Sequence, residues 1–185
     1  MRNMRAYMNS LQTIESRAAG LRAGRQPTTY TEKLLADQNE RVKKLGSEVV
    51  ELVREDTRPD FGESRLIGEA SDTIYSVEVM CAARRISFLQ VLDRIQDQLR
   101  EGWPSQQMAT ELAENRVARY QSLGAYSARL VAEECNPDFS EEGFVDTAAN
   151  LVYMTGVILA GRGLTMRPVF NELAARNENA QGVLS

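Results

Sequence analysis

The feature that most constrains this chain is an internal repeat, which aligns residues 41–94 with residues 119–172 without a gap. About 16 of roughly 54 aligned positions are identical, against about three expected by chance. The clearest match is a Pro-Asp-Phe tripeptide at 59–61, which returns at 137–139. We call two residues that this register aligns counterparts. One such unit is small for a stable core, so we expect two copies to pack against each other.

Helical periodicity runs through almost every long segment, while alternating β-branched residues are few, which argues against sheets. The two Pro-Asp-Phe tripeptides are typical of turns between helices. A Ser or Thr is typical of the residue that caps the start of a helix, and a Glu or Gln three residues later completes a capping box. The predicted caps are two capping boxes, Thr29 with Glu32 and Ser87 with Gln90, and the single residues Ser105, Ser140 and Thr165.

The predicted fold is therefore all-α, a tandem repeat of one helical unit. We expect the first unit over residues 1–103 and the second over 104–185, because Gly102 and Pro104 interrupt the helical pattern at the junction. Pairing of the two units inside one chain would form a pseudo-dimer with a bundle of four central helices.

The first 25 residues hold five arginines and one acid. Leu11, Ile14, Ala18 and Leu21 keep helical spacing, which predicts a first helix; an Arg-rich transit peptide is the alternative. No stretch reads as the roughly 20 apolar residues of a membrane span, so we expect no membrane partner.

Composition narrows the chemistry further. The net charge of −4 provides no overall field for nucleic acid. The chain has no histidine, so catalysis would depend on carboxylates, Lys, Tyr or a hard metal ion. Two cysteines, Cys81 and Cys135, form no disulfide framework and are typical of reduced thiols in a cytoplasmic protein.

Two acidic pairs stand out in the first copy. Glu48 and Glu51 are three residues apart, and so are Glu69 and Asp72, so each pair projects from one side of a helix. Around the helix axis, Glu48 and Glu51 lie roughly 60° and 120° to one side of Leu45, a member of the apolar stripe of their helix. Glu69 and Asp72 lie at the same angles to the same side of Leu66, a member of the other stripe. If the two helices pack antiparallel through the first turn, four carboxylates border one groove and could hold Mg²⁺. Acidic pairs are also ordinary on solvated helix surfaces, and spacing alone leaves that alternative open.

Three motifs in this region resemble those of phosphoribosyl-ATP pyrophosphohydrolases. Residues 30–35 read Tyr-Thr-Glu-Lys-Leu-Leu, similar to the family's Tyr-Thr-x-Lys-Leu-Leu. Residues 44–51 are similar to its Glu-Glu-x-x-Glu helix, and residues 69–75 to its Glu-Ala-x-Asp-x-x-Tyr helix. The resemblance covers roughly residues 11–98 and extends to the wider all-α nucleotide pyrophosphohydrolases, which include MazG-like enzymes.

This resemblance implies hydrolysis of phosphoribosyl-ATP to phosphoribosyl-AMP and pyrophosphate, in histidine biosynthesis. It implies a Mg²⁺ ion bridging the substrate's phosphates. The implied metal ligands are Glu48, Glu51, Glu69 and Asp72, with Glu48 and Glu51 as the catalytic carboxylates. The implied substrate contacts are Lys33, Lys44 and Ser47.

Two departures bear on activity. Ser47 stands where the family has the first acid of Glu-Glu-x-x-Glu, so the site is one charge short. In the second copy all four acidic positions are lost, which predicts a structural partner that binds no Mg²⁺; Arg129 and Tyr126 could alternatively contact phosphate and base. The residues that replace the acids are Tyr126, Arg129, Thr147 and Asn150.

Two alternative functions remain open at this point. One is a house-cleaning pyrophosphatase that acts on other nucleoside triphosphates. The other is a non-catalytic nucleotide-binding or assembly module derived from such an enzyme, which Ser47 favours. In each case the expected partner is a small nucleotide, and the pseudo-dimer could associate further as a homodimer.

Overall fold

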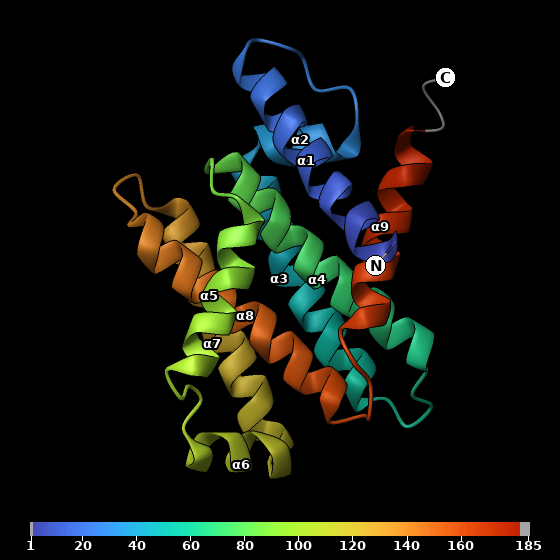
Figure 1. Ribbon diagram of the computed structural model, residues 1–185, viewed down its shortest axis with the longest axis vertical. Coiled ribbons are helices and arrows are strands. Elements are labelled where there is room, and N and C mark those ends of the chain that lie inside the picture. The colour runs from blue at the N-terminus through green and yellow to red at the C-terminus, as the bar shows by residue number, and fades with distance from the viewer. Residues whose placement is uncertain (1, 182–185) are drawn as a thin grey trace.

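The structure is a computed structural model that describes residues 2–181, with side-chain surroundings over 5–176. Helices account for its regular structure, and no strand occurs in the described range, as predicted (Figure 1). Residue 1 and residues 182–185, at the outer ends of the two predicted units, lie outside it. The helices are α1 Arg2–Arg22, α2 Tyr30–Ala36, α3 Gln38–Thr57, α4 Glu63–Ala83, α5 Phe88–Arg100, α6 Gln106–Glu114, α7 Arg116–Cys135, α8 Glu141–Ala160 and α9 Arg167–Gln181.

Most of the predicted helix starts are confirmed. Thr29 and Glu32 form the full capping box of α2, and the Ser105 and Ser140 hydroxyls cap α6 and α8. The capping box predicted at Ser87 is wrong, because that hydroxyl instead donates to Glu15 of α1, at 2.9 Å. Helix α9 begins two residues after Thr165, which therefore does not flank it directly.

Each Pro-Asp-Phe turn joins two long helices into a hairpin: the first turn joins α3 to α4, and the second joins α7 to α8. Each hairpin packs its apolar stripes together, and the hairpins pack against each other. One continuous core cluster contains residues of both halves, so the chain buries a single core. Its fully buried members include Leu45, Leu52, Leu66, Leu123, Leu130 and Phe144.

Buried ion pairs join the two halves. Glu134 on α7 is fully buried and accepts from Arg41 of α3 at 2.7 Å and from Arg84, at the end of α4, at 3.0 Å. Arg162, the counterpart of Arg84, donates to Asp56 at 2.5 Å. Asp56 is in turn the counterpart of Glu134, so the two halves exchange equivalent contacts.

Two cation–π contacts between the halves are also equivalent. Arg84 stacks over Phe139 at 4.5 Å, and Arg162 stacks over Phe61 at 4.7 Å. The two arginines are counterparts, and so are the two phenylalanines. The last helix of each half also crosses over, because α5 packs on α8 while α9 packs on α4 (Figure 1). This exchange brings α9, from the second half, next to the helix that carries two of the predicted site acids.

Helix α1 lies outside this exchange and packs on α4, α9 and α2 (Figure 1). It is the first helix predicted from the spacing of Leu11, Ile14 and Ala18, which are buried. Its Tyr7 hydroxyl donates to Glu78 of α4. Burial raises the pKa of Glu78 to about 8, so this carboxyl is largely protonated at neutral pH.

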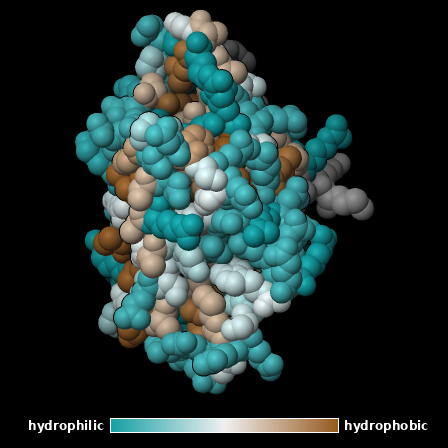
Figure 2. Space-filling model, turned by 90° about the vertical axis from the view of Figure 1, so that its left-hand side faces the viewer, coloured by the Kyte–Doolittle hydropathy of each residue, from teal (hydrophilic) through white to brown (hydrophobic). Residues whose placement is uncertain are grey.

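One expectation about membrane spans needs correction. Helix α8 is long and apolar enough to cross a membrane by length and composition. More than half of its most apolar window is buried inside the protein, where Phe144, Leu151 and Ile158 belong to the core. The surface seen in Figure 2 is mostly hydrophilic, with apolar residues scattered over it and more of them in the left half than in the right.

Candidate metal and phosphate site

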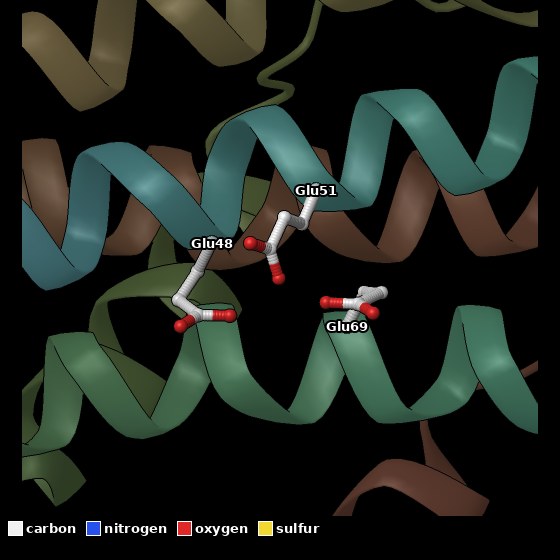
Figure 3. Close-up of side chains that lie close together, drawn as sticks. All are labelled: Glu48, Glu51 and Glu69. Atoms are coloured by element: carbon white, nitrogen blue, oxygen red, sulfur yellow. The ribbon is translucent and has the colours of Figure 1, made fainter.

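Three of the predicted acids converge where α3 and α4 face each other. Glu48 and Glu51 extend from α3 toward α4, and Glu69 extends from α4 to meet them (Figure 3). One carboxylate oxygen from each lies within 4.8 Å of the others. The antiparallel hairpin that brings them together follows from the apolar stripes and the turn between the two helices. We call these three residues the acid cluster.

The acid cluster is partly shielded from water. Glu48 is only 5% exposed, while Glu51 and Glu69 are half-buried. Burial raises the pKa of Glu48, and the negative charges of Asp72 and Glu51 add to that effect. Burial also raises the pKa of Glu69, which faces Glu51, Asp72 and Glu48. Burial is the largest cause of both shifts, and repulsion among the carboxylates adds to it; a bound cation would relieve that repulsion.

Asp72 lies beside the acid cluster but is not part of it. Its carboxylate accepts a hydrogen bond from Arg176 of α9, and the same guanidinium also pairs with Glu172 at 2.5 Å. The second half of the chain therefore contributes a cation to the site of the first. Sequence analysis missed Arg176, whose counterpart in the first copy is the uncharged Gln98.

The predicted substrate contacts are placed differently from one another. Lys44 forms an ion pair with Glu48 one helical turn away. Ser47 is exposed on α3, and its hydroxyl donates to Glu51 at 3.3 Å, so it borders the acid cluster. Lys33 is exposed on α2 and makes no side-chain hydrogen bond or ion pair within the described chain.

Helix α2 is nevertheless tied to the helix that bears Glu69. The Thr31 hydroxyl and the Tyr75 hydroxyl lie 2.6 Å apart, which joins α2 to α4. These residues belong to two of the motifs noted in the sequence, so the motifs meet in space. The hydrogen bond therefore holds the helix that bears Lys33 against the helix that bears Glu69.

The donor set fits a hard divalent cation. Three carboxylates that crowd together offer oxygen ligands only, which is the chemistry that Mg²⁺ prefers. One ligand is buried and two are half-exposed, so a cation held here would keep an open side toward solvent. Waters or phosphate oxygens could complete its coordination from that side.

Comparison with known proteins points to the same segment. A sequence model of the family described as phosphoribosyl-ATP pyrophosphohydrolase matches residues 16–99. The chain is 33% identical over 90 residues to a phosphoribosyl-ATP pyrophosphatase from Dinoroseobacter shibae, covering 48% of this chain and 86% of that protein. It is 42% identical over 78 residues to the one from Paracoccus denitrificans, covering 40% of this chain and 70% of that protein. No solved structure matches.

Proposed function

This chain belongs to the phosphoribosyl-ATP pyrophosphohydrolase family, and we propose that it hydrolyses phosphoribosyl-ATP to phosphoribosyl-AMP and pyrophosphate, a step of histidine biosynthesis. The observation that carries the proposal is the acid cluster, which lies inside the segment that the family matches. In this reaction the anhydride bond between the α and β phosphates breaks. Water supplies the oxygen atom that replaces that bond, and its proton passes to a base.

The proposed cofactor is Mg²⁺, with Glu48, Glu51 and Glu69 as its ligands. A bound divalent cation would supply Lewis-acid polarisation of the phosphate oxygens. Asp72 completes the proposed ligand set once Arg176 leaves it for a substrate phosphate. Support for that exchange comes from position, because Arg176 already lies next to Asp72 at the edge of the acid cluster.

The side chains of this site have distinct proposed roles. Glu48 and Glu51 orient the attacking water, and burial raises the pKa of Glu48, which suits this carboxylate to accept a proton. Lys44 and Ser47 contact phosphate from α3, since both already touch members of the acid cluster. Lys33 is proposed as a phosphate contact on the strength of the family motif alone.

We further propose that the second half takes the place of a partner subunit. The exchanged contacts of Arg84 and Arg162 support a tandem duplication arranged as an intrachain pseudo-dimer. Its units are residues 1–103 and 104–185, and the pseudo-dimer could still pair with a second chain. A small nucleotide is the proposed partner and the cytoplasm the proposed location, in keeping with Cys81 and Cys135 as free thiols.

One observation favours a second candidate function, nucleotide binding without turnover. Ser47 replaces an acid of the family motif and is exposed beside Glu51, so the site holds one negative charge fewer than the motif specifies. Weaker metal binding would follow from that loss. Binding of the nucleotide could persist, because Lys44 and Arg176 supply positive charge independently of Ser47.

Pyrophosphate release tests these functions directly. The purified chain is incubated with Mg²⁺ and either phosphoribosyl-ATP or a panel of nucleoside triphosphates, alongside the Glu51→Gln variant. The proposal predicts release from phosphoribosyl-ATP by the wild type and loss of that release in Glu51→Gln. Release from the nucleoside triphosphates alone would indicate a house-cleaning enzyme. No release from any substrate, with nucleotide binding retained, would indicate the non-catalytic module.

A further inference from the structure

The two halves differ in how much of their central helix is covered. Helix α4 packs against α1, α2, α3, α8 and α9 and more lightly against α5, whereas its counterpart α8 packs mainly against α4, α5 and α7. Three of the contacts of α4 therefore have an equivalent on α8. Helix α7 takes the place of α3, α4 takes the place of α8, and α5 takes the place of α9. Within residues 2–181, no helix lies on α8 in the place that α1 takes on α4, and α6 does not pack on α8 as α2 packs on α4.

Counterpart residues on α4 and α8 differ in their exposure to solvent, as the missing helix would require. Val79 and Ala82 on α4 are 1% and 4% exposed, because Ile14 and Ala18 of α1 pack against them. Their counterparts on α8, Val157 and Ala160, are half-buried and exposed, respectively. Identical residues at the same helical positions are thus covered in one half and open in the other.

A groove lies where the missing helix would be. Its two sections have volumes of about 620 Å³ and 200 Å³ and share Tyr153, Val157 and Ala160. These three residues are spaced by four and three, so they form a stripe along one face of α8. We call this feature the α8 groove, and its walls include Leu92 and Ile95 of α5, Phe170 of α9 and Leu112 of α6.

The polar contacts that hold α1 in the first half also have counterparts in the α8 groove. Ser87 donates to Glu15 of α1, and the carbonyl of Ala82 accepts from Arg22 of α1 at 3.2 Å. The corresponding residues are Thr165, with its hydroxyl, and Ala160, with its carbonyl, and both residues line the groove. A helix with the polar pattern of α1 would find the same anchors.

The lining of the groove is almost uncharged. Arg119 is the one charged residue among those that line its two sections. Gly156 replaces Glu78 on the floor of the groove, so no buried carboxylate has to be matched there. The occupant is therefore recognised by its apolar stripe and by the polar anchors at Thr165 and Ala160.

We propose that the α8 groove binds an amphipathic helix with the apolar and polar pattern of α1, supplied by a partner protein. The expected apolar stripe has the spacing of four, three and four residues that Tyr7, Leu11, Ile14 and Ala18 show in α1. The chain's own α1 is not available, since these side chains are already at most 4% exposed where α1 packs on α4 and α9, and Tyr7 itself borders the groove beside Phe170. A second copy of the chain would carry the same buried α1, which is why a different protein is the occupant.

A synthetic peptide with the sequence of α1 is a suitable probe. The labelled peptide is titrated with the full chain, and binding is followed by fluorescence anisotropy. The matched control peptide carries Leu11→Asp and Ile14→Asp, which remove the apolar stripe. The proposal predicts saturable binding of the first peptide and none of the second.

Two variants of the chain locate the binding. Gly156→Leu fills the floor of the groove and should fold, because leucine is the better helix former and a Cβ there meets only the flexible Met166 side chain, at 3.4 Å. Ala160→Arg places a bulky side chain at an exposed groove position, where it would obstruct a docked helix. Each variant should weaken peptide binding at least about tenfold, and thermal unfolding confirms that each is folded.

Three results would overturn the proposal. The peptide could fail to bind the wild type at any concentration at which it stays soluble. It could bind wild type and both variants equally, which would place it elsewhere, for example in the place that α1 occupies on the first half. The chain could also self-associate in size-exclusion chromatography with light scattering, in a manner that Gly156→Leu abolishes, which would make a second copy the occupant.

Discussion

A glutamate in place of Ser47 is expected to tighten Mg²⁺ binding about tenfold. The Ser47 hydroxyl lies 3.3 Å from a carboxylate oxygen of Glu51, so a longer acidic side chain at this position can reach the acid cluster. Ser47 is exposed on α3, and the substitution therefore buries no charge. The apo protein should keep its stability, since glutamate is a good helix former and a like charge at i,i+4 costs only a few tenths of a kcal/mol.

The magnitude follows from Coulomb's law at an exposed site. Two unit charges about 4 Å apart gain about 1 kcal/mol in water and about 4 kcal/mol at an effective dielectric of 20. The exposure of Ser47 argues for the value in water, and the double charge of Mg²⁺ raises it to about 2 kcal/mol. Ordering of the new side chain and the loss of its hydration reduce that gain, which leaves about 1.4 kcal/mol, or a factor of ten.

Isothermal titration calorimetry with Mg²⁺ at fixed ionic strength measures the effect. Ser47→Gln is the matched control, because it has nearly the same shape as Ser47→Glu and no charge. Only Ser47→Glu should bind the ion more tightly than wild type, and pyrophosphate release from phosphoribosyl-ATP should rise with it. Equal affinities for the two variants would mean that position 47 does not face the metal and that the family motif has been placed on α3 in the wrong register.

Three further outcomes are expected. Glu134→Gln should cost about 3–5 kcal/mol of unfolding free energy in urea denaturation, because it leaves Arg41 buried without a counter-charge; a cost below about 1 kcal/mol would contradict this. Arg176→Met should raise Mg²⁺ affinity by removing a cation next to Asp72, yet lower pyrophosphate release; unchanged values of both would exclude Arg176 from the site. Because burial raises the pKa of Glu48, the thermal stabilisation by Mg²⁺ should be lost as the pH falls through a value above that of an ordinary glutamate. Without metal the same group should make the fold more stable as the pH falls, since it takes up its proton in the folded state first.

Local patterns predicted much of the first half. The positions of Glu48, Glu51 and Glu69 on two helices follow from spacing, and the turn at 59–61 folds those helices into a hairpin. Such features depend on residues close in sequence, whose geometry helical periodicity fixes. One core cluster contains residues from both parts of the chain, while their origin by duplication stays a prediction.

Contacts between distant segments could not be read in this way. Arg176 and Asp72 are far apart in the sequence, and the crossing of α9 onto α4 that unites them leaves no mark in local periodicity. Ser87 has the sequence of a capping residue, but the approach of α1 offers its hydroxyl a carboxylate instead. Helix α8 is apolar enough to resemble a membrane span because, as a core helix, it is buried from several sides.

The central claim is that the acid cluster holds one Mg²⁺ ion. Calorimetric titration of Mg²⁺ into wild type, Glu69→Gln and the control Glu63→Gln, an exposed acid on the same helix, tests it most directly. The account predicts one ion per chain in wild type and Glu63→Gln, and a loss of affinity of at least about tenfold in Glu69→Gln. Equal affinity in all three proteins, or a second ion of similar affinity, would contradict it.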